Sequence, residues 1–160
     1  MAVTVELQGD WQKTGRALRR LGQVNWRDLH EEIGELLVSS TRDRFRRGIG
    51  PDGKPWRPSV RARKEGGQTL RDTGLLANSI HYAADSRHVE VGTNDKRARV
   101  HQEGMTIRPK RAKWLRFRLA DQWVTLKQVT IPARPFVGLS AHDEQAIDEA
   151  LRRRIEEALG

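Results

Sequence analysis

The residue types that carry most enzyme chemistry occur in this sequence, but their spacing does not assemble a site. The five histidines are scattered, and none belongs to HExxH or another metal-ligand spacing: His30, His81, His88, His101 and His142. The chain has no cysteine, so it has neither a thiol nucleophile nor a disulfide. No GxSxG or Walker loop is present. The sequence therefore predicts a protein that is not an enzyme and uses no cofactor or metal.

One glycine motif matches a nucleotide-binding spacing. Gly48, Gly50 and Gly53 satisfy GxGxxG. The dinucleotide fingerprint follows a strand and opens a helix, whereas this motif follows an expected helix and contains Pro51 and Asp52. Proline presets φ and glycine takes the left-handed conformation, so we interpret this stretch as a tight turn.

The longest expected element is an amphipathic helix between Asn25 and Gly48. Its apolar residues recur every three or four positions: Trp26, Leu29, Ile33, Leu36, Leu37 and Phe45. The side chain of Asn25 is expected to accept from the free amides of the first turn, and Gly48 to end the helix. A helix with one apolar face needs a sheet or other helices to cover it.

Alternating apolar residues predict that cover as a mainly antiparallel sheet of four or five strands. The expected strands are 80–84, 88–93, 105–108, 113–119 and 122–131, the first two forming a hairpin. A final helix is expected to begin at Ser140 or Asp143, with an apolar stripe at Ile147, Leu151, Ile155 and Leu159. The expected fold class is α+β, with the sheet packed against the long helix and a C-terminal helix beyond it.

The 160 residues suit one domain, 1–160, with an N-terminal arm (1–24) and a long loop (48–68). In the arm, residues 1–7 alternate in part like a strand, and a short helix is expected from Asp10 to near Gly22. The loop is rich in glycine, proline and basic residues, so we expect it to be mobile in the isolated subunit and ordered by assembly. No apolar run reaches the roughly 20 residues that cross a bilayer, so no membrane association is expected.

Positive charge is concentrated in the middle of the chain. The formal net charge is +9, yet residues 42–118 contain 20 basic and 8 acidic residues, whereas residues 140–160 contain 3 basic and 6 acidic. A basic field of this kind attracts nucleic acid or an acidic protein surface.

Four residues on stiff, proline-containing segments are candidates for contacts with a partner. Trp56 and Arg57 lie between two prolines, and Trp56 either fills the core or contacts a partner. Arg134 and Phe136 belong to IPARPF, whose prolines end the sheet and fix the backbone. The alternative is that Phe136 fills the core under the last helix while Arg134 pairs with an acid there.

Four stretches together resemble the phage virion morphogenesis family, the tail completion proteins of Mu-like and P2-like phages. They are FRRGIGPDGKPW from Phe45, LRDTGLLANSI from Leu70, VGTNDKRARVHQEG from Val91 and IPARPFVGLS from Ile131. The resemblance implies a non-enzymatic structural protein that completes the tail or joins it to the head, as a ring of identical copies. It implies a place in the virion tail or neck after assembly in the host cytoplasm.

The partners implied are further copies of the chain and other phage tail or neck proteins, with any DNA contact non-specific. The alternative function is a basic nucleic-acid-binding regulatory protein. A basic stripe with interleaved aromatic residues would favour that alternative, and we attribute the aromatic residues here to the sheet.

Overall fold

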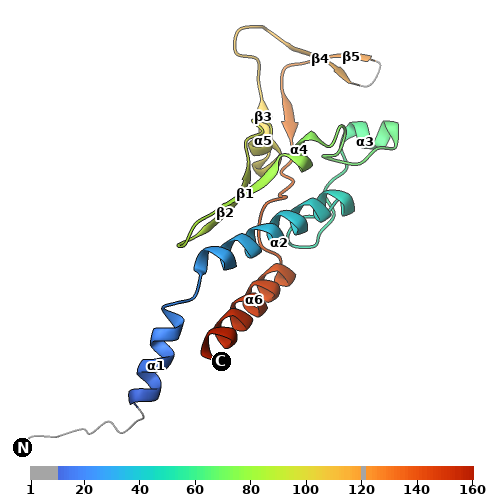
Figure 1. Ribbon diagram of the computed structural model, residues 1–160. Coiled ribbons are helices and arrows are strands. Elements are labelled where there is room, and N and C mark those ends of the chain that lie inside the picture. The colour runs from blue at the N-terminus through green and yellow to red at the C-terminus, as the bar shows by residue number, and fades with distance from the viewer. Residues whose placement is uncertain (1–10, 120–121) are drawn as a thin grey trace, which may run out of the picture.

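The computed structural model describes residues 11–119 and 122–160, which form a mixed fold of helices and short strands (Figure 1). The helices are α1 (Trp11–Leu21), α2 (Trp26–Arg47), α3 (Val60–Glu65), α4 (Leu75–Asn78), α5 (Ala98–Glu103) and α6 (Ala141–Leu159). The strands are β1 (Ile80–Ala84), β2 (Val89–Thr93), β3 (Met105–Ile107), β4 (Leu115–Leu119), β5 (Gln122–Leu126) and β6 (Val129–Ile131). The strand expected within residues 1–7 lies outside the described residues.

Helix α2 runs through the middle of the molecule and occupies the range between its two expected end residues. Gly48 has a φ of 70°, and its amide donates to the carbonyl of Arg44 at 2.7 Å, which ends the helix as expected. The expected side-chain cap at Asn25 is wrong, because that side chain makes no capping bond. Asn25 has a ψ of 88°, whereas Ser140, which does cap α6, is extended with a ψ of 163°.

The core packs against α2 in two clusters. The larger cluster surrounds the C-terminal half of the helix and contains Val38, Phe45, Trp56, Leu76, Ala77, Ile80, Ala98 and Phe136. The smaller one joins the N-terminal half to α6 through Leu29, Ile33 and Ala150, with Ile147 and Leu151 packed against it. The β1–β2 hairpin and α6 therefore both pack against α2 and cover its apolar residues.

The expectation of a single sheet of four or five strands is wrong. The strands form three separate antiparallel pairs, β1–β2, β3–β6 and β4–β5. The stretch expected to be one strand, 122–131, divides between two partners, because β5 pairs with β4 while β6 pairs with β3. The β4–β5 pair consequently stands away from α2 and α6 as an arm, here called the ribbon (Figure 1).

The loop at 48–68 is more structured than its composition indicates. It contains α3 and a bridge between Ile49 and Pro55, and the amide of Gly53 donates to the carbonyl of Gly50 at 3.0 Å in the expected tight turn. The buried Trp56 anchors the loop in the larger core cluster. The mobility of this loop in the isolated subunit stays a prediction.

Close packing between α2 and β1 depends on Gly34. A Cβ atom at this position would lie 2.4 Å from Cδ2 of the Tyr82 ring, well inside van der Waals contact. Gly34→Ala is therefore expected to destabilise the subunit by about 1–3 kcal/mol through overpacking, more than the ~1 kcal/mol that alanine gains in helix propensity. Urea denaturation measures the difference.

Gly15→Ala in α1 is the matched control. Its added Cβ would meet only the flexible guanidinium of Arg19, at 3.6 Å. That variant is expected to be neutral or slightly stabilising. Equal stability of the two variants would contradict the close contact between Gly34 and Tyr82.

Candidate interaction surfaces

The structure brings the two proline-containing segments together but places most of their candidate residues inside the subunit. Trp56 is 7% exposed and Phe136 1%, whereas the side chain of Arg57 is exposed. The rings of Trp56 and Phe136 both pack against Phe45, with centroids 5.4 and 5.1 Å from its ring. The indole Nε1 of Trp56 donates to the carbonyl of Pro135 at 2.8 Å. Their contacts in this structure are internal, and a partner contact by these residues stays a prediction.

Arg134 is buried, at 5% exposed, and it has no acidic partner among the described residues. Its Nε donates to the carbonyl of Arg57 at 2.8 Å, and its amide donates to the carbonyl of His101 at 2.7 Å. Burial, followed by the charge of Arg57, lowers the pKa of Arg134. The expected pairing with an acid is therefore wrong, and Arg134 instead holds the loop to the IPARPF segment through a backbone carbonyl.

Gln102 on α5 is a residue that sequence reasoning missed. Its Oε1 accepts from the amides of Phe136 and Val137 at 3.0 and 3.1 Å, and its Nε2 donates to the carbonyl of Val137 at 2.9 Å. The Gln102 side chain thus satisfies backbone groups of Phe136 and Val137 as a neighbouring β-strand would. The prolines keep this segment out of the sheets. Nothing in the spacing of the sequence indicates this role.

A buried ion pair also fixes the IPARPF segment, between α2 and α6. The guanidinium of Arg44 donates to the carbonyls of Phe136 and Gly138 at 3.1 and 2.7 Å and contacts the carboxylate of Asp143. Asp143 also completes a capping box with Ser140. Burial raises the pKa of Asp143, but hydrogen bonds from Ser40 and Ser140 and the charge of Arg44 outweigh it, so that the pKa is lowered.

The ribbon is the part of the molecule where aromatic and basic side chains are exposed together. Trp123 is 64% exposed and Trp114 42%. The Arg116 guanidinium lies 4.9 Å from the Trp123 ring centroid, and the Lys127 ammonium lies 5.4 Å from that of Trp114. The expectation that a sheet core explains these aromatic residues is wrong for both tryptophans, because the ribbon does not join the β1–β2 pair that packs on α2.

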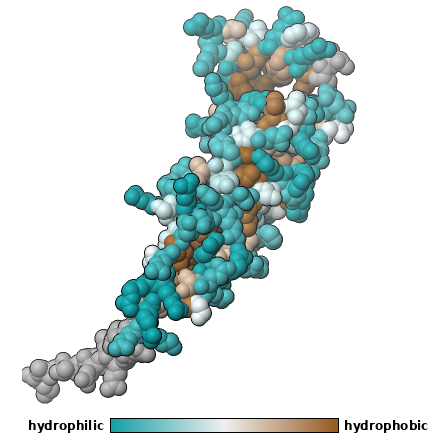
Figure 2. All heavy atoms as spheres, viewed as in Figure 1, coloured by the Kyte–Doolittle hydropathy of each residue, from teal (hydrophilic) through white to brown (hydrophobic). Residues whose placement is uncertain are grey.

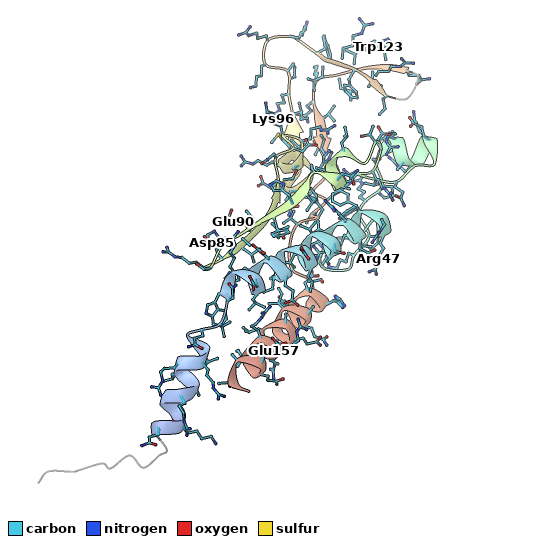
Figure 3. The ribbon with its side chains drawn as sticks, in the orientation of Figure 1. Arg47, Asp85, Glu90, Lys96, Trp123 and Glu157 are labelled. Atoms are coloured by element: carbon cyan, nitrogen blue, oxygen red, sulfur yellow. The ribbon has the colours of Figure 1, made fainter. Side chains whose placement is uncertain are left out.

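Helix α6 carries exposed acids on its solvent side, together with the exposed Arg152 and Arg153. Its exposed acids are Glu144, Asp148, Glu149, Glu156 and Glu157. Figure 3 shows Trp123 on the ribbon far from Glu157 on α6, with α1 extending beyond α6. On the face that Figure 2 draws, apolar atoms lie in the ribbon and in further patches along the middle of the molecule, among hydrophilic side chains. Helix α6 packs against α1, which carries Lys13, Arg16, Arg19 and Arg20 and no acid, so this part of the subunit bears charge of both signs.

The described residues, 11–119 and 122–160, also bear on metal binding and membrane insertion. Within these residues, no group of three or more His, Asp or Glu side chains is placed to hold a metal ion. None of the helices in the same residues has the length and apolar character needed to cross a bilayer.

The sequence profile of the phage virion morphogenesis family matches residues 9–156, which is most of the chain. The chain belongs to that family. It is also 30% identical, over an alignment of 169 residues, to "Putative capsid assembly protein G" of Escherichia phage Mu, and the alignment covers 99% of each chain. No solved structure gives a significant match. Membership of this family supports a virion-associated, structural role in phage assembly.

Proposed function

We propose that this chain completes the phage tail or joins the tail to the head during assembly, as a ring of identical copies. The observation that carries the proposal is the extent of the match. The family profile covers residues 9–156, and the Mu relative aligns from end to end, so the whole subunit shares the organisation of a morphogenesis protein.

The name of the Mu relative refers to the capsid, whereas tail completion acts on the tail. A protein at the junction of head and tail meets both structures, and this is the position that we assign to the chain.

The proposal is tested in a phage that lacks the gene. We expect such a phage to accumulate heads and tails that fail to join, and the full-length chain supplied from a plasmid to restore joined particles. Electron microscopy of the purified chain is expected to show rings. Joined, infectious particles without the gene would overturn the assembly role, whereas the absence of rings alone would overturn only the oligomeric part.

The ribbon is the one observation that favours the alternative of nucleic-acid binding, because it combines basic and exposed aromatic side chains. If assembly contacts are the main role of the basic region, binding to random duplex DNA should be weak. Such binding should disappear by ~0.2 M salt, because phosphate contacts weaken steeply with ionic strength. Fluorescence anisotropy across a salt series measures it, and tight binding above that concentration would favour the alternative.

A further inference from the structure

A recess lies where α3, α4 and α5 meet the IPARPF segment, and basic side chains dominate its polar wall. Arg61 comes from α3, Arg97 and His101 from the start and the middle of α5, and Arg134 from IPARPF. The cavity has a volume of about 230 Å³. This is below the roughly 300 Å³ at which pockets for drug-sized ligands begin, so the recess suits one small group.

Arg134 is a buried cation in this wall, and the subunit does not supply its counter-ion. The side chain is 5% exposed, and its Nε donates to the carbonyl of Arg57. The two terminal nitrogens, Nη1 and Nη2, make no hydrogen bond to residues 11–119 or 122–160. Buried charges are normally paired, because a charge removed from water without a partner costs several kcal/mol.

The acids around the recess are already paired with other arginines. Asp72, which belongs to the wall, lies 3.5 Å from the guanidinium of Arg61. Asp95 lies 2.7 Å from that of Arg97. These two pairs balance each other in charge, so the recess keeps the single positive charge of Arg134 in excess.

His101, in the same wall, responds to this excess. Its Nδ1 is buried and has no hydrogen-bond partner among the described residues. Burial, followed by the charges of Arg134 and Arg97, lowers the pKa of His101, while the charge of Asp95 opposes the shift. The imidazole therefore reports on the charge in the recess, because a bound anion would raise its pKa.

The rest of the wall is apolar, which favours a carboxylate on a hydrocarbon stem over a phosphate. Leu70, Leu75 and Leu76 line the recess, and Leu75 is 61% exposed. The methylene groups of an aspartate or glutamate side chain can pack on these leucines while the carboxylate binds the terminal nitrogens of Arg134. A DNA phosphodiester carries a polar sugar on each side, which a recess of this size does not admit.

We propose that this recess binds the carboxylate of an aspartate or glutamate side chain from a protein partner, with Arg134 as its buried counter-ion. The identity of the partner as a protein rests on the assembly role proposed above. Binding of the carboxylate itself is a property of the isolated subunit, so it can be tested separately.

The test titrates the full-length chain with propionate, which reproduces the end of a glutamate side chain. Nuclear magnetic resonance of the ¹⁵N-labelled histidine rings follows His101. We expect its signals to shift to a saturating value and its pKa to rise, whereas sodium chloride at the same ionic strength has neither effect. Arg134→Met should weaken binding about tenfold or more, because it removes the counter-ion and keeps an apolar side chain of similar length.

Arg97→Ala and Arg99→Ala are a matched pair that keeps Arg134 in place. Both arginines are exposed and each pairs with an acid, Arg97 with Asp95 and Arg99 with Glu103, but only Arg97 lines the recess. Without Arg97 the charge of Asp95 is left unbalanced near the recess and repels an anion. We expect Arg97→Ala to weaken propionate binding several-fold and to restore few joined particles in the phage test, whereas Arg99→Ala behaves like the original chain.

The contrary outcomes are distinguishable. Shifts that do not saturate, or that chloride reproduces, mean that there is no anion site. Binding that survives Arg134→Met places the carboxylate elsewhere. If inorganic phosphate or a short DNA duplex shifts the His101 signals at lower concentration than propionate, the recess is a phosphate site. If propionate binds as expected and Arg97→Ala still joins heads to tails normally, the site stands but its role in assembly does not.

Discussion

Asp143→Ala is expected to destabilise the subunit by about 3–5 kcal/mol, because it leaves the buried guanidinium of Arg44 without its counter-ion. The carboxylate is fully buried and also serves the capping box of α6 through Ser140. Its loss therefore affects both the contact between α2 and α6 and the first turn of α6. Urea denaturation followed by circular dichroism measures the change in the free energy of unfolding.

The double variant R44M/D143L separates an unpaired charge from a general loss of packing. Replacing a buried ion pair by apolar residues of similar size is often neutral or stabilising, so the double variant should recover much of the stability lost in Asp143→Ala. Recovery will be incomplete because Arg44 also donates to the carbonyls of Phe136 and Gly138. A cost for Asp143→Ala below ~1 kcal/mol would contradict the buried pair.

The lowered pKa of Asp143 gives the same interaction a pH signature. A carboxyl whose pKa is lower in the folded than in the unfolded state stabilises the fold above its ordinary value, near 3.8. That stabilisation is lost as the pH falls through the lower, folded value. The original chain should therefore lose stability in acid more steeply than Asp143→Asn, which has no proton to take up at this position.

Elements with local signals could be predicted from the sequence. Both ends of α2 follow from the spacing of its apolar residues and from Gly48, and the β1–β2 hairpin follows from two alternating segments joined by a short turn. The N-terminal cap of α6 is likewise indicated by the residue type at Ser140 itself. In each case the signal and the structure lie within a few residues of each other.

The partition of the strands and the internal contacts could not be predicted in this way. Alternation in 122–131 indicates a strand but not that its two halves pair with different partners. Arg44 and Asp143 are 99 positions apart, and each has an ordinary local role, as a basic residue at a helix end and as a cap. For the IPARPF segment, fixed proline geometry predicts rigidity equally well for a buried connector and for an exposed one.

Phe136→Ala and Arg134→Ala are expected to affect stability by different amounts, and the difference tests what the IPARPF segment does. Phe136 is almost fully buried beside Phe45, so its truncation should cost about 3–5 kcal/mol. Arg134→Ala removes one hydrogen bond to the carbonyl of Arg57 and leaves that acceptor unpaired, which should cost about 1–3 kcal/mol.

Arg57→Ala is the control for both variants, because the exposed Arg57 side chain can be removed while the carbonyl that Arg134 binds stays in place. We expect its melting temperature to match that of the original chain. The contrary result would be an Arg134→Ala subunit that melts normally yet fails to join heads to tails. If the only role of Arg134 were its internal hydrogen bond, removing the guanidinium would lower the melting temperature. A normal melting temperature with failed joining would therefore mean that Arg134 leaves this contact to engage a partner.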